Sequence, residues 1–350
     1  MSEPNLTLYQ IADAEIRRCI QAYLELMRAT RGLSAVTPEA LQDERARVIL
    51  LTGLGLPGQS VSAGEACEEW RRRQAVPFDP ETGITHGVYR NIRQSGARFL
   101  DQVEAATDHF SNFDPAFIQR NPHLLPILQH LGGLFSKAAL KKQVGSVSDS
   151  SISRPAAIRL STLLKTRVDP TSVDKGQILQ RLESTLEGIV RDLVGRVLLE
   201  SIVDSALRDQ NVPFQREHEY SSLAGVVYDF RADFVLPDSE RPLAFIEVRK
   251  SSSRHASLYA KDKMFSAINW KGKNSSLLAV LVVDGEWTRE TLRVMANVFD
   301  YVVPITRVTE LVETVSAYLD GDTSKLKWLI QFRITPATPT ALTEHPPASP

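Results

Sequence analysis

The sequence predicts an α/β protein in which a mixed β-sheet core is flanked by helices and preceded by a mainly helical N-terminal domain. Apolar residues recur at helical spacing in the first 130 or so residues and again over residues 178–207. Residues 226–236 and 243–248 are short runs enriched in β-branched and aromatic side chains and separated by a turn, which is typical of a hairpin. The continuous apolar run 277–283 is typical of a strand buried on both faces.

The N-terminal domain is expected over residues 1–155. Ile11, Ile16, Ile20, Tyr23 and Leu24 follow helical spacing near its start. The serine-rich segment 145–155 has few apolar residues, so it is interpreted as a linker, as a DNA-contacting loop, or as both. A helical domain in this position can provide DNA recognition, dimerisation, or both, and the sequence leaves that choice open.

The second domain is expected over residues 156–330. Its long amphipathic helix ends before Pro213, since proline disrupts a helix interior. After the hairpin, the pattern predicts a basic helix, the buried strand, a helix, a short strand and a last helix, which together make a mixed sheet with flanking helices. Residues 335–350 are rich in proline and threonine and are expected to be disordered.

The composition excludes several classes of protein. With 43% hydrophobic and 24% charged residues, the chain of 350 residues reads as a water-soluble globular protein. No stretch is long and apolar enough to span a membrane, and the N-terminus lacks the basic and apolar regions of a signal peptide. The two cysteines exclude a disulfide scaffold and a zinc site built from cysteine pairs. A cytoplasmic protein is expected.

The distribution of charge is more informative than the net charge of −1. Between Arg241 and Lys273 there are eight Lys/Arg residues against two acidic residues, and over residues 131–175 the ratio is eight to three. Local basic surfaces of this kind fit a nucleic-acid groove, although a solvated helix face gives the same pattern.

Asp233 and Glu247 are the residues on which the functional hypothesis depends. In a hairpin that turns near residues 238–242 they fall roughly opposite each other, with Cβ atoms about 4.5–5.5 Å apart. Two carboxylates at that separation repel unless a cation lies between them. Oxygen ligands suit a hard divalent ion such as Mg²⁺, which often takes one or two carboxylates together with phosphate oxygens and water.

This arrangement resembles the PD-(D/E)XK nuclease superfamily, which includes most type II restriction endonucleases. Asp233 and the sequence from Glu247 to Lys250 carry the resemblance, which covers residues 175–315 and extends to the order of the elements. It implies a restriction-endonuclease-like core. Arg249 stands where the superfamily has its lysine, and Ala232 stands where it has proline.

The resemblance leaves the lysine role open among several residues. Arg249 shares the strand face of Glu247, but its guanidinium stays protonated and cannot act as a base. Lys250, in an E-x-x-K arrangement, is the favoured candidate, and Lys261 or Lys263 of the next helix are the alternatives. The superfamily often takes a further acidic residue from the preceding helix, and here Glu187 is preferred over Glu183 as a third metal ligand.

The predicted contacts with DNA phosphates come from basic residues that follow the hairpin. Such contacts position an enzyme on DNA without reading its sequence. The candidates are Arg254, Lys261, Lys263, Lys271 and Lys273.

The hypothesis from sequence is therefore a Mg²⁺-dependent endonuclease of the type II restriction class that hydrolyses double-stranded DNA. A homodimer is expected, since cutting two antiparallel strands suits two-fold symmetry. Two alternatives remain: a DNA-repair or mobile-element nuclease of the same fold, and a DNA-binding module whose catalytic site has decayed. The arginine at position 249 is the main argument for the second.

Overall fold

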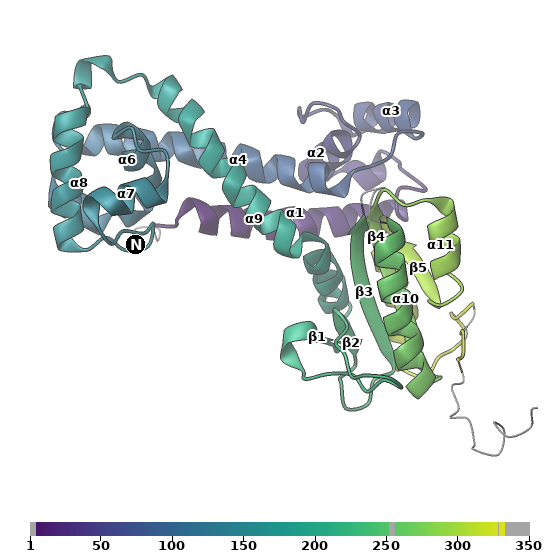
Figure 1. The fold of residues 1–350 in the computed structure, drawn as a ribbon. Coiled ribbons are helices and arrows are strands. Elements are labelled where there is room, and N and C mark those ends of the chain that lie inside the picture. Colours follow the sequence, from purple (N-terminus) through teal and green to yellow (C-terminus); the bar gives the residue numbers. More distant parts are fainter. Residues whose placement is uncertain (1–4, 252–255, 328, 333–350) are drawn as a thin grey trace, which may run out of the picture. The chain divides into compact units, whose positions relative to one another are not determined.

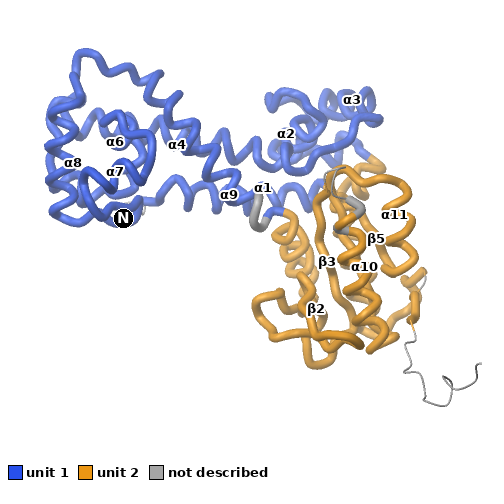
Figure 2. The backbone as a smooth tube through the Cα atoms, in the orientation of Figure 1, with its two compact units in different colours: residues 1–26, 36–198 blue, residues 27–35, 199–350 orange. Residues whose placement is uncertain are grey.

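The computed structural model describes residues 5–251, 256–327 and 329–332. The chain forms two compact units, shown in different colours in Figure 2. Unit 1 comprises residues 1–26 and 36–198, and unit 2 comprises residues 27–35 and 199–350. The protein is an α/β protein, as predicted, with its helices in both units and its sheet in unit 2.

Three long helices run through unit 1, and Figure 1 shows them lying alongside one another. They are α1 (Leu8–Thr30), α4 (Pro80–Ala106) and α9 (Lys175–Asp209), of which α1 and α9 continue into unit 2. Asn91 of α4 donates a hydrogen bond to Glu15 of α1 at 3.3 Å. Arg93 Nε of α4 lies 2.9 Å from Glu183 Oε1 of α9. These contacts tie together the helices that the apolar periodicity predicts.

Shorter helices complete unit 1, and most begin at a residue whose side chain accepts a backbone N–H of the first turn. Asp43, Ser62, Asp114, Ser136 and Ser153 are such N-caps. The helices are α2 (Glu44–Gly53), α3 (Ala63–Arg73), α5 (Pro115–Arg120), α6 (Leu125–Leu131), α7 (Lys137–Val144) and α8 (Arg154–Arg167).

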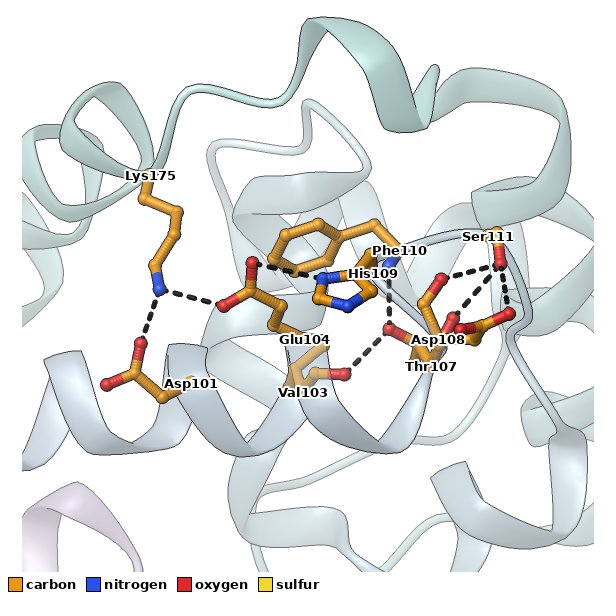
Figure 3. A network of polar contacts seen from close by, with 9 residues as sticks. All are labelled: Asp101, Val103, Glu104, Thr107, Asp108, His109, Phe110, Ser111 and Lys175. Carbon is orange, nitrogen blue, oxygen red and sulfur yellow. Dashed lines mark hydrogen bonds and ion pairs between the residues drawn. The ribbon is translucent and has the colours of Figure 1, made fainter.

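Figure 3 shows how the first residue of α9 is held at the end of α4. Lys175 Nζ lies 2.5 Å from Asp101 Oδ1 and 2.8 Å from Glu104 Oε2. A cation at a helix N-terminus opposes the helix dipole, and these two carboxylates offset that cost. Thr107 Oγ1 donates to the carbonyl of Val103 at 2.6 Å, next to the turn in which the chain leaves α4.

The boundary predicted between residues 155 and 156 is wrong. The serine-rich segment before it is a folded turn, in which Val147 and Ile152 form an antiparallel bridge. It joins α7 to α8, and these helices are fastened together because Arg159 Nε of α8 donates to the carbonyl of Val144 of α7 at 2.9 Å. Consequently α8 and most of α9 belong to unit 1, and the division falls after Leu198.

Unit 2 contains a five-stranded mixed sheet with its strands in chain order. β2 is antiparallel to both β1 and β3, whereas β3, β4 and β5 run parallel. The strands are β1 (Gln215–Arg216), β2 (Phe234–Leu236), β3 (Ala244–Ser251), β4 (Leu278–Gly285) and β5 (Tyr301–Pro304). The helices that follow β3 are α10 (Ala256–Lys273), α11 (Arg289–Met295) and α12 (Val308–Leu319).

The predicted hairpin and buried strand are confirmed, but the first hairpin strand is much shorter than residues 226–236. Only Phe234–Leu236 pair with β3. The carboxamide of Asn269 on α10 accepts from the backbone N–H of Val227 at 2.7 Å and donates to the carbonyl of Tyr228 at 2.8 Å. These bonds satisfy the backbone groups that a longer strand would have offered to the sheet.

The core of unit 2 lies between the sheet and α10. Trp270 of α10 is buried and meets Phe245 of β3 edge-on, with ring centroids 4.8 Å apart. Phe245 meets Phe299 in the same way at 6.2 Å. Side chains on both faces of β4 are buried, as its continuous apolar sequence predicts.

A buried ion pair lies within this core. Lys271 of α10 has no exposed surface, and its Nζ lies 2.5 Å from Asp300 Oδ2 and 3.0 Å from the carbonyl of Leu277. Asp300 also accepts the backbone N–H of Ala279 at 2.6 Å. Burial lowers the pKa of Lys271, and Asp300 opposes that shift. The pair therefore fixes the end of α10 to the start of β4.

Replacement of Lys271 tests this pair. Lys271→Met should lower the free energy of unfolding by about 3–5 kcal/mol, because it removes the cation that faces a buried carboxylate. Lys273→Met, two residues further along α10 and exposed, should change it by less than about 0.5 kcal/mol. Urea denaturation of both variants measures the difference, and equal stabilities would contradict the buried pair.

Candidate functional site

Asp233 and Glu247 come together because of the register between β2 and β3. Phe234 pairs with Ile246, so one residue further along the ladder Asp233 lies opposite Glu247. Residues directly opposite in an antiparallel pair point to the same face of the sheet, with Cβ atoms about 4.5–5.5 Å apart. Two residues before Glu247 on β3, Phe245 packs against Trp270, so this face is the one covered by α10.

The carboxylate of Asp233 ends the β2–β3 ladder. Its Oδ2 accepts the backbone N–H of Val248 at 2.7 Å. The side chain thereby takes a donor that a longer β2 would have bound through its backbone. This bond fixes the orientation of the carboxylate, which is 8% exposed.

Two cations accompany the two carboxylates. Lys263 Nζ of α10 lies 2.6 Å from Glu247 Oε2, and the lysine is buried. Arg249 bridges the pair, with Nη1 3.4 Å from Asp233 Oδ2 and Nη2 3.6 Å from Glu247 Oε2. The site thus holds two acidic and two basic side chains, and the cations reduce the repulsion between the carboxylates.

Glu247 is the least solvated member of the site. It is fully buried, and its Oε1 has no hydrogen-bond partner among the described residues. Burial raises the pKa of Glu247 to about 8 and the charge of Asp233 adds to the shift, while Lys263 and Arg249 oppose it. A buried oxygen left in this way is a ready position for a further cation.

The structure favours Lys263 over the other lysines as the partner of Glu247. Lys250, the residue preferred from sequence, is three positions from Glu247 on β3 and therefore points to the opposite face. Its Nζ lies 3.8 Å from Asp284 Oδ2. Lys261 is exposed to solvent. The preference for Lys250 is therefore wrong, and the alternative on the next helix is the one that reaches Glu247.

The predicted phosphate-contacting residues divide into two groups. Lys261 and Lys273 are exposed, so their role stays a prediction. Lys271 is wrong as a phosphate contact, because it is buried against Asp300. Lys263 is likewise buried and bound to Glu247 rather than displayed on an outer surface. Arg254 lies outside the described residues.

Within the part of the chain that the structure describes, no third acidic ligand lies beside Asp233 and Glu247. Among residues 5–251, 256–327 and 329–332, no group of three or more Asp, Glu, His or Cys side chains is arranged to hold a metal ion. Glu187 is exposed on the part of α9 that belongs to unit 1, and its role as a ligand stays a prediction. The carboxylate of Glu183 accepts hydrogen bonds from the guanidinium of Arg93.

A further acidic residue, which the sequence pattern does not single out, lies on the part of α9 that belongs to unit 2. Glu200 Oε2 lies 2.7 Å from Arg216 Nη2, and Arg216 pairs with Phe234, the neighbour of Asp233. The apolar stripe of α9, which favours Glu187, does not mark where the helix passes from one unit to the other, so it gives no signal for Glu200.

Tyr220 positions the residue before Asp233. Its hydroxyl donates to the carbonyl of Ala232 at 2.8 Å and accepts the backbone N–H of Ala232 at 2.6 Å. Burial raises the pKa of Tyr220, and the hydrogen bond with Ala232 opposes that shift. No local sequence signal links residues 220 and 232.

The donor set fits a divalent cation of the Mg²⁺ class. Asp233 and Glu247 present carboxylate oxygens from neighbouring strands, and Glu247 Oε1 is buried without a hydrogen bond within the described part of the chain. Hard cations prefer oxygen ligands of this kind. These two residues are the ones that would hold the ion.

The comparisons with known proteins add no relative. No protein-family model, no curated protein and no solved structure matches this chain. Among the described helices, none has the length and apolar character needed to cross a membrane.

Cation binding provides a direct test of the site. Mg²⁺ or Mn²⁺ should raise the melting temperature of the protein, with a stabilisation of about 2.7 kcal/mol when the free ion is at 100 times its dissociation constant. Asp233→Asn and Glu247→Gln should each abolish this shift, since each removes one charged ligand. Glu240→Gln alters an exposed carboxylate in the β2–β3 turn and should retain it. Shifts of equal size in all four proteins would contradict the site.

Proposed function

We propose that the protein is a metal-dependent deoxyribonuclease of the type II restriction endonuclease class, acting on double-stranded DNA in the cytoplasm. The supporting observation is the set Asp233, Glu247 and Lys263, in which two acids oppose each other across neighbouring strands and an ammonium touches one of them. This set fits the chemistry of the PD-(D/E)XK superfamily, with its lysine contributed by a helix instead of the strand.

The order of the elements supports the same proposal. A helix precedes the antiparallel β2–β3 pair, α10 then crosses over to β4, and β4 is parallel to β3 and buried. This order agrees with the restriction-endonuclease-like core that the sequence resemblance implies. The charged set lies on the face of this sheet that α10 covers.

Each residue of the set has a distinct task in the proposed reaction. A Mg²⁺ ion held by these residues would lower the pKa of the attacking water and neutralise the negative charge that develops on the phosphate. The N–H of Val248 orients Asp233, and burial shields Glu247 from water and holds it in place. Both carboxylates are therefore positioned before the substrate binds.

The cations complete this division of tasks. Lys263 orients the attacking water, since its ammonium extends from a buried stem beside Glu247. Arg249, about a third exposed, provides a permanent positive charge for the phosphate.

The contact between Lys263 and Glu247 argues against a DNA-binding module whose catalytic site has decayed. That alternative rests on Arg249 replacing the expected lysine. Because Lys263 lies 2.6 Å from Glu247 Oε2, the ammonium is present at the site although the strand does not carry it. A homodimer remains part of the proposal, since two symmetric sites suit the two antiparallel strands of DNA.

Cleavage of supercoiled plasmid tests the function. We expect nicking and linearisation with Mg²⁺ or Mn²⁺ and none with EDTA. Asp233→Ala and Glu247→Ala should reduce cutting to the EDTA level, because each removes a ligand of the cation. The restriction class further requires fragments with ends at one defined sequence, whereas a repair nuclease would cut at damaged or branched positions. Cutting that persists in both alanine variants would overturn the site assignment.

A lysine series tests the assignment of the ammonium. Lys263→Met should lower the single-turnover rate by about 100-fold or more, the usual contribution of a positioned proton donor or acceptor. Lys250→Met should keep the rate, because its side chain lies on the other face of β3. Melting curves verify that each variant is folded. A large loss in Lys250→Met with an unaffected Lys263→Met would reverse the assignment.

A further inference from the structure

Unit 1 contains a basic surface that the proposed cleavage site does not use. From Lys137 to Arg167 the chain has seven Lys/Arg residues and one acidic residue. This segment is α7, the serine-rich turn and α8, which Figure 1 shows close together beside α6. Lys137 is paired with the single acid, Asp149, at 2.7 Å.

The other six have no carboxylate partner within the described part of the chain, but Arg159 and Arg167 are hydrogen-bonded to neighbouring carbonyl oxygens. The remaining four are exposed. We call them the α7–α8 basic surface: Lys141, Lys142, Arg154 and Lys165. The contrast within unit 1 is α3, where Arg71, Arg72 and Arg73 all bind Glu68 or Glu69. Charges neutralised in that way have little attraction left for a polyanion, whereas the α7–α8 basic surface keeps its own.

The two helices form one platform because α8 is fastened to its neighbours. Arg167 Nη2 donates to Gln143 Oε1 of α7 at 3.1 Å. On the inner side of α8, Ser161 Oγ donates to the carbonyl of Phe113 at 2.5 Å, and Leu160 and Leu164 are fully buried. The opposite side of α8 is therefore presented to solvent in a fixed orientation.

The exposed side of α8 has a cation near each end and an apolar and a hydroxyl side chain between them. Arg154, Ile158, Thr162 and Lys165 follow one another at intervals of three or four residues, so they share one helix face. Ile158 is 48% exposed, although it is large and apolar. An apolar side chain beside a threonine hydroxyl, between two cations, is the pattern expected where phosphates flank base edges.

We propose that α8 binds in the major groove of duplex DNA and that Ile158 and Thr162 read base edges there. The helix has 14 residues, which is about 21 Å of length at 1.5 Å per residue. Its width of about 10–12 Å matches a major groove about 12 Å wide. Lys141, Lys142, Arg154 and Lys165 contact phosphates on the flanking backbones. The inference rests on the proposed function only in its choice of double-stranded DNA as the polyanion.

The test measures DNA binding without cleavage. The full chain is titrated into a fluorescently labelled duplex in EDTA over a range of KCl concentrations, and anisotropy gives the affinity. The test variant is Lys141→Gln/Arg154→Gln/Lys165→Gln. Its matched control is Arg71→Gln/Arg72→Gln/Arg73→Gln, which removes the same charge from the paired residues of α3.

We expect the test variant to bind at least about tenfold more weakly and the slope of log affinity against log salt to fall by about 2.7, or 0.9 for each lost phosphate contact. The control variant should bind as the wild type does. An unchanged slope in the test variant, or an equal loss in the control, would overturn the inference. So would intact DNA binding combined with lost binding to phosphatidylserine vesicles, which would make the surface a membrane contact.

Base reading has its own readout. Ile158→Ala/Thr162→Ala should keep the salt slope and lose the preference for sequences that the wild type selects from a random duplex pool. An unaltered preference would remove base reading from α8. If the wild-type protein does not cut DNA with Mg²⁺ but the triple variant loses DNA binding, the nuclease proposal alone is wrong. If the wild-type protein cuts DNA and the triple variant binds DNA as the wild type does, this inference alone is wrong.

Discussion

The opposition of Asp233 and Glu247 constrains the rest of unit 2. Two carboxylates directly across an antiparallel pair, one of them fully buried, are costly unless cations and donors surround them. Three sets of contacts offset that cost. The N–H of Val248 donates to Asp233, Arg249 forms ion pairs with both acids, and Lys263 of α10 forms an ion pair with Glu247. The early end of β2 and the buried lysine of α10 both accompany the two acids, and the pKa of Glu247 is raised mainly by burial and further by the charge of Asp233.

The sequence was sufficient for features that depend on local periodicity. Alternation and turn residues predict the hairpin, the apolar run predicts β4, and the spacing from residue 233 to residue 247 predicts that the two acids oppose each other. These features depend on neighbours in the chain or on one tight turn. The charge pattern of residues 131–175 predicts a basic surface, although it does not reveal which of those cations are paired with acidic residues in the structure.

Features that depend on tertiary packing could not be predicted. Residues 226–231 have the composition of a strand, yet Asn269, some forty positions later, holds their backbone in a loop. Lys271 and Lys273 are alike in sequence context, but one is buried against Asp300 and the other is exposed. The serine-rich segment resembles a linker in composition, while the bridge between Val147 and Ile152 makes it a compact turn. In the first two cases a partner distant in sequence decides the outcome, and in the third a bridge across a short turn does.

Because Lys263 comes from α10, the position of that helix determines the contact between Lys263 and Glu247. A strand lysine two positions from Glu247 would be held by the backbone of β3 alone. Lys263 is instead held by whatever holds α10, and Trp270, two turns further along, packs that helix against Phe245. A slip of one helical turn would displace the ammonium by about 5.4 Å. Large aromatic side chains deep in unit 2 thus set the distance between the Lys263 ammonium and Glu247, so tight packing there serves precision as well as stability.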